Sequence, residues 1–287
     1  IEQIRAAYLK ATEEMQHVAR QQEAAARALR EGEQKREAMA ARRDTLREMQ
    51  QDYDGFMHGV REVLKRRHDA DVLTGIHGAV AELLRVDQKH EAAIETALGS
   101  ALQNIVVETE ADARRAIGYL KRKQLGRATF LPMDVIRERA IPDKELSAVA
   151  GIAGFVGAAV DLVRYDPRYD AVMRHLLGQI LVADGLEPAG RIAAACRYRY
   201  RVVTLDGDVI HPGGPMTGGS RQKQSGGLLS RARQIEAMDR EIESLGESLV
   251  RMRDKLAEWQ KAGEALSARL DELRREGGYD AGECGVA

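Results

Sequence analysis

The sequence has little of several residues on which common protein classes depend. Of its 287 residues only two are cysteine and six are proline, and aromatic residues make up 4%. Cys196 and Cys284 stand alone, without a Cys-x-x-Cys pair or histidines at ligand spacing. This pattern argues against a structural zinc site and against a disulfide framework. No apolar run is long enough to span a bilayer.

An excess of charge of one sign is also lacking. Charged residues make up 31% of the chain, yet the formal net charge is −1. Any contact with nucleic acid must therefore come from local patches and not from a bulk field. Many charges with few aromatics suit long solvated helices flanking a modest core. Because the sequence opens with Ile1 in mid-pattern, we expect a piece of a longer cytoplasmic protein, with residues 277–287 as a frayed or non-native tail.

Residues 1–53 carry a heptad repeat without a break in phase and without proline, which is typical of a coiled-coil arm. The alternative is one long amphipathic helix packed on a globule. One seam is mostly apolar and the other turns polar toward its end. The first of these seams contains Ile4, Ala11, Val18, Ala25, Gly32, Met39, Leu46 and Tyr53, and the second contains Ile1, Tyr8, Met15, Gln22, Leu29, Arg36, Arg43 and Gln50.

Residues 228–276 predict a second arm with a stronger repeat. Its seams contain Ile235, Ile242, Leu249, Leu256, Gly263 and Leu270, and Met238, Leu245, Met252, Trp259, Leu266 and Leu273. If the arms meet near Tyr53 and Leu228, small residues face large ones in layer after layer, which keeps the seam at constant thickness. We therefore predict an antiparallel coiled coil that sets Leu46 opposite Ile235, Met39 opposite Ile242, Gly32 opposite Leu249, Leu29 opposite Met252, Ala25 opposite Leu256, Val18 opposite Gly263 and Ala11 opposite Leu270.

Between the arms, residues 54–227 alternate between strand and helix patterns, which predicts a mixed α/β globular domain. We expect two related subdomains, at about 54–145 and 152–227. A strand is expected to start in the segment 76–84, and further strands are expected at 104–108, 128–131, 160–163 and 180–183. The expected helices cover 91–102, 109 to Gly126, 168–177 and 187–196. Thr109 and Asp112 have capping-box spacing, and Ile117 and Leu120 are expected to face the core.

A glycine-rich stretch from Val202 to Ser220, VVTLDGDVIHPGGPMTGGS, closes this domain. Asp206-Gly207 favours a tight two-residue hairpin turn between strands at 202–205 and 208–211. The glycines that follow allow three interpretations. A phosphate-binding loop lacks its lysine, since position 219 is glycine. A flexible return loop is the plainest interpretation, and the third is a glycine-lined edge strand on which another chain docks.

Three segments decide between these interpretations: GIHGAVAELL, AAIETALGSALQNIVVETEADARRAIGYLKRKQLGRATFLP and the glycine-rich stretch itself. They resemble the hinge of bacterial structural maintenance of chromosomes (SMC) proteins, and the resemblance covers the globule and continues into both arms. It implies two small α/β subdomains between antiparallel coiled-coil arms. It also implies a homodimer that joins two ATPase-headed arms into a ring or V that holds DNA, although those heads are not in this chain.

The resemblance assigns functions to particular residues. It implies a dimer interface, which we place at Gly207, Gly213, Gly214, Met216, Thr217, Gly218 and Gly219. It also implies weak, sequence-independent DNA binding, for which the basic groups next to the arms and the glycine loop are candidates: Lys121, Arg122, Lys123, Arg127, Arg221 and Lys223. Kleisin-type and loading proteins are expected partners of the full-length parent, in the nucleoid region of the cytoplasm.

Plainer explanations compete with the DNA assignment. Charge runs are usually solvated faces, and cations suit helix C-termini regardless of function. Two further groups, Lys65–Arg67 and Arg197–Arg201 with the interleaved Tyr198 and Tyr200, are open to the same explanation, and the tyrosines suit either base stacking or core packing.

Catalysis has little support in the sequence. Asp206, Asp208 and His211 lie close together, but no nucleophile or metal triad completes a site. We therefore predict no catalytic residues, no metal and no cofactor. The rival to the hinge interpretation is a coiled-coil insertion domain that binds a small ligand or protein without dimerising.

Overall fold

A computed structural model describes residues 2–69, 73–219 and 227–277. By their contacts, these residues form two compact units. One contains the chain up to Thr45 together with the chain from Ile235, and the other is Leu46–Gln234.

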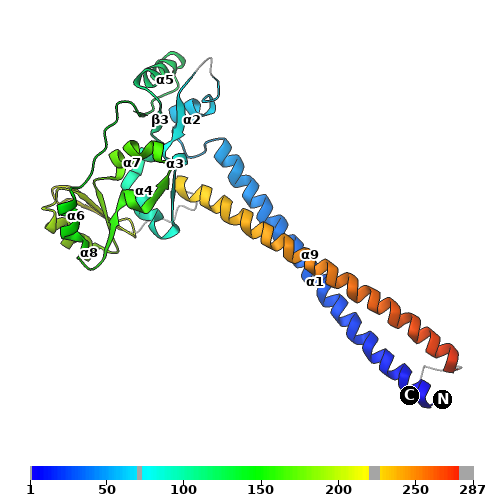
Figure 1. The fold of residues 1–287 in the computed structure, drawn as a ribbon. Coiled ribbons are helices and arrows are strands. Elements are labelled where there is room, and N and C mark those ends of the chain that lie inside the picture. Colours follow the sequence, from blue (N-terminus) through cyan, green and yellow to red (C-terminus); the bar gives the residue numbers. More distant parts are fainter. Residues whose placement is uncertain (1, 70–72, 220–226, 278–287) are drawn as a thin grey trace. The chain divides into compact units, whose positions relative to one another are not determined.

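The first unit is a pair of long antiparallel helices, as the heptad repeats predict (Figure 1). Helix α1 covers Glu2–Gln51 and helix α9 covers Leu228–Gly277. Their predicted register is confirmed by direct contacts. A Cβ placed on Gly32 would lie 2.6 Å from Cδ2 of Leu249, and one placed on Gly263 would lie 3.6 Å from Cγ1 of Val18.

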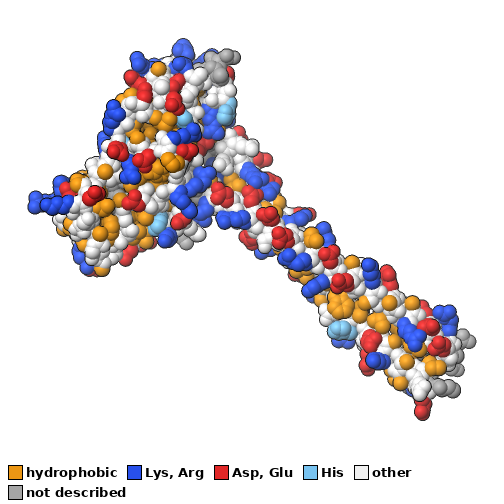
Figure 2. Space-filling view, viewed as in Figure 1, with side chains coloured by type: hydrophobic (Ala, Val, Ile, Leu, Met, Phe, Trp, Pro, Cys, Tyr) orange, Lys and Arg blue, Asp and Glu red, His pale blue; other side chains and the backbone are white. Residues whose placement is uncertain are grey.

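Burial within this unit follows the two predicted seams. Ala11, Val18, Leu249 and Leu273 are buried, and the other described seam positions of this unit are at least partly buried. Outside the seams, acidic and basic side chains are interspersed over the visible surface (Figure 2). The ion pair between Lys35 and Glu241, at 3.4 Å, is well exposed and therefore stabilises the helix pair little. The two helices are therefore held together mainly by their apolar seam.

The second unit contains two sheets and a short ribbon, joined by helices. The three-stranded sheet has the order β1 (Ile76–Ala79), β3 (Ile105–Val107), β4 (Phe130–Pro132). The five-stranded sheet has the order β10 (Met216–Thr217), β9 (Val209–Ile210), β8 (Arg201–Thr204), β7 (Ile180–Ala183), β5 (Phe155–Ala158). The ribbon pairs β2 (Leu84–Val86) with β6 (Val163–Tyr165).

The helices of this unit are short. They are α2 (His58–Lys65), α3 (Val80–Leu83), α4 (Glu91–Leu98), α5 (Glu110–Lys123), α6 (Asp143–Ala150), α7 (Asp170–Leu177) and α8 (Leu186–Ala195). The described residues of this unit also form four 3₁₀ turns, which lie between a strand and a helix or between two strands: η1 (Gln88–His90), η2 (Gly99–Gln103), η3 (Ala159–Leu162) and η4 (Pro167–Tyr169). The mixed α/β fold between two long helices is as predicted.

The two halves of this unit repeat one another in sequence and structure. GIHGAVAELLRVD at 75–87 matches GFVGAAVDLVRYD at 154–166. Both segments begin with a strand that bulges at its second glycine, Gly78 (φ 145°) and Gly157 (φ 154°), and that pairs with the next long strand of its own sheet. Glycine suits these bulges because side chains rarely adopt such a φ.

The ribbon relates the two repeats by an approximate two-fold axis. Arg85 of β2 lies opposite Arg164 of β6, and Leu84 and Val86 lie opposite Tyr165 and Val163. Because Arg85 and Arg164 occupy equivalent positions in the repeated segments, each repeat presents the same face to the other. The pairing therefore joins the halves symmetrically.

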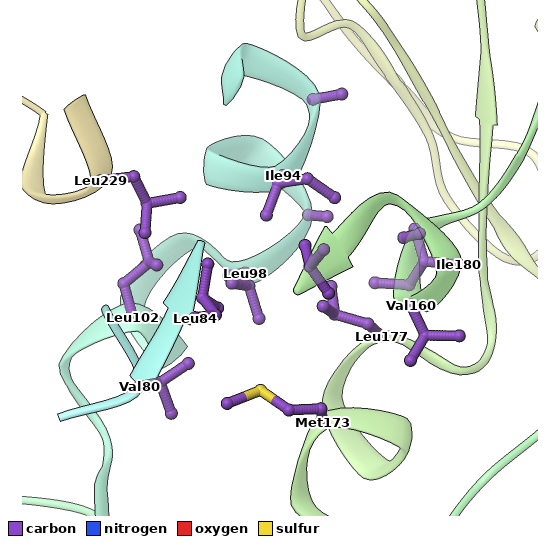
Figure 3. Packing of buried hydrophobic residues seen from close by; sticks show 14 of the residues in the cluster. Val80, Leu84, Ile94, Leu98, Leu102, Val160, Met173, Leu177, Ile180 and Leu229 are labelled. Carbon is purple, nitrogen blue, oxygen red and sulfur yellow. The ribbon is translucent and has the colours of Figure 1, made fainter. Parts of the chain in front are cut away.

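The largest buried cluster draws on both halves. Figure 3 shows Leu84, Ile94 and Leu98 from the first repeat beside Val160, Leu177 and Ile180 from the second. The division at about 54–145 and 152–227 stays a prediction. Helix α6 lies between those limits, and its Val149 packs with Leu181 and Ile192 in the core of the second sheet.

Several local predictions are confirmed. The strand at 180–183 is β7, and Leu120 is buried in the core as expected. Thr109 caps α5 with Asp112 in a capping box: the Asp112 backbone N–H donates to the Thr109 hydroxyl (3.2 Å), and the Thr109 N–H donates to the Asp112 carboxylate (3.2 Å).

Other local predictions are wrong. Ile117 is 39% exposed, because the buried stripe of α5 follows residues 112, 113, 116, 119 and 120 and passes beside it. Residues 159–162 form the turn η3 and not a strand, since the strand of the second repeat lies earlier, at Phe155–Ala158. The strand expected from residue 76 ends at Ala79, where α3 begins.

Candidate functional site

The hairpin that opens the glycine-rich stretch forms as predicted, but with a longer turn. Val202 pairs with Ile210 and Val203 with Val209. The Thr204 N–H donates to the Asp208 carbonyl (2.9 Å) and the Gly207 N–H to the Thr204 carbonyl (2.9 Å), which leaves three residues in the loop. Gly207 has φ 92° and takes the left-handed place that such a loop requires. The hairpin turn of this chain is therefore sufficient to explain why residue 207 is a glycine.

The chain after β9 folds back along the same sheet and adds β10. The His211 N–H donates to the Pro215 carbonyl (2.7 Å) and the Gly214 N–H to the His211 carbonyl (3.0 Å), which makes a tight return. Gly213 and Gly214 have φ 83° and 105°. Because a strand runs through 216–217, this segment does not have the form of a phosphate-binding loop, in which a helix follows directly.

The last two glycines are held by Asp208. The Gly219 N–H donates to Oδ1 of Asp208 (3.2 Å). A Cβ on Gly218 would lie 2.4 Å from that same oxygen, whereas a Cβ on Gly219, with φ 137°, would meet nothing within 4 Å. Gly218 is therefore required by close approach to a side chain, and Gly219 by its backbone conformation.

Strand β10 lies at the edge of the five-stranded sheet and is exposed. Met216 has 58% of its surface exposed. Since His211 and Pro215 share a hydrogen bond, the antiparallel ladder turns the backbone of Thr217 toward β9 and that of Met216 away from it. The N–H and C=O of Met216 are thus directed outward from the sheet edge, as in a strand that can pair further.

Strand β4 is a second sheet edge of this kind. The Ile105 N–H donates to the Thr129 carbonyl and the Met133 N–H to the Val107 carbonyl, both at 2.9 Å. In the parallel ladder these bonds turn alternate residues toward β3, so the N–H and C=O of Phe130 point away from it. In the second repeat β9 and β10 extend the sheet beyond β8, whereas β4 is the last strand of its own sheet.

Tyr198 lies beside the glycine loop. This position was not predicted from the sequence. The Gly213 N–H donates to the Tyr198 carbonyl (2.8 Å), and a Cβ on Gly214 would lie 4.0 Å from the Tyr198 ring. Tyr198 is 41% exposed, whereas Tyr200 is 9% exposed and packs in the core. Core packing thus accounts for Tyr200 only. Consecutive left-handed residues, Arg197 (φ 53°) and Tyr198 (φ 52°), place the ring there, and the sequence carries no glycine to signal such a turn.

The basic candidates divide by their contacts. Lys121, Arg122 and Lys123 form the exposed last turn of α5, and Arg127 is exposed just beyond it. In the part of the chain that the structure describes, these four residues form no ion pair. Arg221 and Lys223 lie outside the described residues.

The other two basic groups are largely engaged. Lys65 lies 3.6 Å from Asp52, and Arg67 lies 3.1 Å from Glu82. Arg199 lies 2.5 Å from Glu145, and Arg201 donates to the Ala97 carbonyl (3.2 Å).

The sequence and the fold of this chain are similar to those of known proteins. The family model described as the flexible hinge domain of SMC proteins matches residues 73–193. The crystal structure of an asymmetric dimer of the Geobacillus stearothermophilus SMC hinge domain is similar, with a TM-score of 0.78 and 46% identity, over 86% of this chain and 98% of that one. The chain belongs to the SMC hinge family.

Curated relatives of the hinge are much longer than this chain. The chromosome partition protein Smc of Bacillus subtilis is 44% identical over 207 residues, which is 72% of this chain and 17% of that protein. The namesake from Desulfitobacterium hafniense is 40% identical over 236 residues, which is 82% of this chain and 19% of that protein. The chain thus spans less than a fifth of these two relatives.

Side chains that suggested chemistry in the hinge have structural partners. Asp208 accepts from Gly219, and His211 Nε2 lies 3.1 Å from the Thr217 hydroxyl. Among the described residues there is no group of three or more His, Cys, Asp or Glu side chains that could hold a metal ion. A search of the same residues finds no helix that is both long and apolar enough to cross a membrane.

Proposed function

We propose that this chain is the homodimerisation hinge of an SMC-type chromosome partition protein. The observation that carries the proposal is the exposed outer edge of β10, with the Met216 backbone directed outward and its side chain 58% exposed. The similar Geobacillus hinge domain is described as a dimer, which supports the same assembly here. The interface comprises the exposed residues of the return loop, Gly213, Gly214, Met216, Thr217, Gly218 and Gly219, next to Tyr198.

The second free edge suggests how two copies meet. A β10 edge of one chain that pairs with the β4 edge of its partner joins two sheets, and two-fold symmetry repeats this contact. Met216 and Phe130 would then supply the paired N–H and C=O groups. Gly207 takes its conformation from its own hairpin turn. It is connected to this contact only through the chain that follows the hairpin.

Mass and cross-linking test the assembly. We expect sedimentation to give about twice the 31.7 kDa of one chain. Chains carrying Met216→Cys, mixed with chains carrying Phe130→Cys, are expected to oxidise to a covalent dimer, whereas either chain alone is not. Cys284 is replaced by serine in all samples. A covalent dimer from the Met216→Cys chain alone would show that two β10 edges pair with each other instead.

A monomer at all concentrations would favour the rival function, an insertion domain that binds a ligand or protein without dimerising. The rival has one observation in its favour, a cavity in the globular unit lined by Arg67, His77 and Arg231. The exposed apolar side chain of Met216 on a bare strand edge favours the dimer, because such an edge is a ready template for pairing.

We also propose weak, sequence-independent contact with DNA through Lys121, Arg122, Lys123 and Arg127. Their support is exposure without ion pairs in the described part of the chain, so these cations can exchange counterions for phosphates. For the full-length parent we propose further functions on the strength of the family resemblance alone. These are ATP-driven chromosome condensation and segregation, kleisin-type and loading partners, and a place in the nucleoid.

A further inference from the structure

The globular unit contains a cavity of about 450 Å³ that the dimer edges do not use. Its walls come from the C-terminal end of α1, the turn after that helix, Arg67 and His68 beyond α2, the segment 76–85 and the first turn of α9. No residue of β4 or β10 lines it. The cavity is within the range of small-ligand sites.

One side chain in this wall has an unmet requirement. Arg231 is 7% exposed, and one of its terminal nitrogens donates to the carbonyls of Met49 (3.1 Å) and Asp54 (2.8 Å). Its Nε is buried and makes no hydrogen bond within the described part of the chain. A buried charged donor without an acceptor is costly, so an acceptor supplied from outside the chain would stabilise it.

The charge of the wall indicates what that acceptor is. Arg67 and Arg85 line the cavity with Arg231, and Glu82 is the one acidic residue among the described residues that line it. Both Glu82 oxygens are engaged, one with Arg67 (3.1 Å) and the other with the Ala79 N–H (2.9 Å). Among the described residues Arg231 has no carboxylate partner, since Glu82 is paired with Arg67, so this wall carries a positive charge that favours an anion.

The rest of the wall is apolar and aromatic. The rings of Tyr53 and Phe56 meet edge to face with centroids 5.9 Å apart, and Ile76 and Leu228 lie beside them in the lining. His77 offers no further donor, because its nitrogens lie 2.7 Å from the Glu108 carboxylate and 3.2 Å from the Tyr169 hydroxyl. A ligand that matches this cavity has an anionic group and a flat apolar part.

We propose that the cavity binds a small organic phosphate of about the size of a nucleoside monophosphate. The charges of Arg231, Arg85 and Arg67 in the cavity wall attract the phosphate, and guanidinium groups match phosphate geometry. The flat part packs against Tyr53 and Phe56. The same chemistry is available from a free nucleotide and from the end of a nucleic acid strand, and the free nucleotide is the ligand assigned to this cavity.

Isothermal titration of the full chain tests the site with three probes: adenosine monophosphate, adenosine and inorganic phosphate. We expect saturable binding of the monophosphate, at least tenfold tighter than either part alone. Arg85→Gln should weaken that binding about tenfold, which is the expected effect of removing one charge-assisted contact. Arg164→Gln is the matched control, because Arg164 holds the equivalent place in the second repeat and lies outside the cavity lining.

A second variant guards against an effect on folding alone. Ala232→Leu fills the cavity from α9 without a change of charge, and we expect it to abolish binding while the circular dichroism spectrum is preserved. Any one of three results would overturn the proposal: no saturation at millimolar monophosphate, equal weakening by Arg164→Gln, or binding of an oligonucleotide without terminal phosphate while the monophosphate does not bind.

Discussion

Single residues explain why each glycine of the return loop is a glycine, and the reasons differ. The cluster in the sequence predicts close backbone approach or unusual dihedrals, and both occur. Gly213, Gly214 and Gly219 have positive φ, whereas Gly218 is limited by Asp208. The sequence could not separate these causes, because the oxygen that limits Gly218 lies on a residue of the preceding hairpin. A glycine substitution here changes the fold of the loop as well as its surface.

The contact between Gly218 and Asp208 can be tested by a double-mutant cycle. Gly218→Ala should lower the free energy of unfolding by about 1–2 kcal/mol, because its Cβ would lie 2.4 Å from the Asp208 carboxylate. In an Asp208→Ala background the same substitution should cost less, since the obstructing oxygen is gone. Urea unfolding measures both values. Equal costs in the two backgrounds would place the restriction on Gly218 elsewhere.

Asp112 predicts how stability responds to acid. Burial raises the pKa of its carboxyl, but hydrogen bonds from Thr109 and Thr74 and the charge of Arg115 more than offset this, so the pKa lies below the ordinary 3.8. A lowered folded-state pKa gives stability that is full above the unfolded value and is lost as pH falls through the folded value.

We therefore expect Asp112→Asn to reduce the free energy of unfolding at pH 7 by about 1 kcal/mol or more. The wild-type chain should also lose more stability than the variant as the pH falls below the ordinary carboxyl pKa of 3.8. Urea unfolding along a pH series measures this difference. Parallel curves for the two proteins would contradict the role assigned to the carboxylate, and Asp143→Asn, at an exposed helix start, is the control.

At the scale of elements, what is local in sequence was predicted well and what depends on distant partners was not. The heptad seams, the Thr109 cap and β7 follow from short-range patterns. The assignment of 160–163 as a strand failed because an apolar run of this length also suits the buried turn η3. Helix α6 was missed because its segment offers one fully buried side chain, Val149, whose partners lie on β7 and α8.

The register of the helix pair is open to cross-linking. Cysteines at Leu29 and Met252 should oxidise to a bridge within one chain, because the contact of Gly32 with Leu249 sets these positions opposite one another one turn away. The control pairs Leu29→Cys with Leu245→Cys, one heptad out of register, and should bridge far more slowly. Gel mobility under non-reducing conditions reports both. Preferential bridging of the control pair would refute the register.

At the scale of the whole molecule, assembly and DNA contact came from the resemblance to the hinge family and not from composition. Net charge of −1 gives no general attraction to DNA, so binding must depend on patches and fall steeply with salt. The residue count, the charge and the heptads suit many coiled-coil proteins. The β4 edge and Tyr198 could not be predicted, because the pairing of strands distant in sequence places both of them.

For DNA, Lys121→Glu, Arg122→Glu and Lys123→Glu together should weaken binding at least tenfold at low salt and leave the sedimentation coefficient unchanged. The control reverses three exposed cations of the helix pair, Lys10, Arg20 and Lys261, for the same change in net charge. Fluorescence anisotropy with a labelled duplex measures both variants. Equal weakening by the two triplets would show a general charge effect and would remove the assignment to α5.

The central claim is that the β10 edge joins two chains, and light scattering of Met216→Glu tests it most directly. Glutamate on this edge brings charge into the interface without disturbing a glycine, so the mass should fall from two chains to one while circular dichroism is preserved. Met57→Glu is the matched control, because Met57 is also 58% exposed and lies in the same unit outside both sheet edges. A Met216→Glu chain that keeps the dimer mass would contradict the claim.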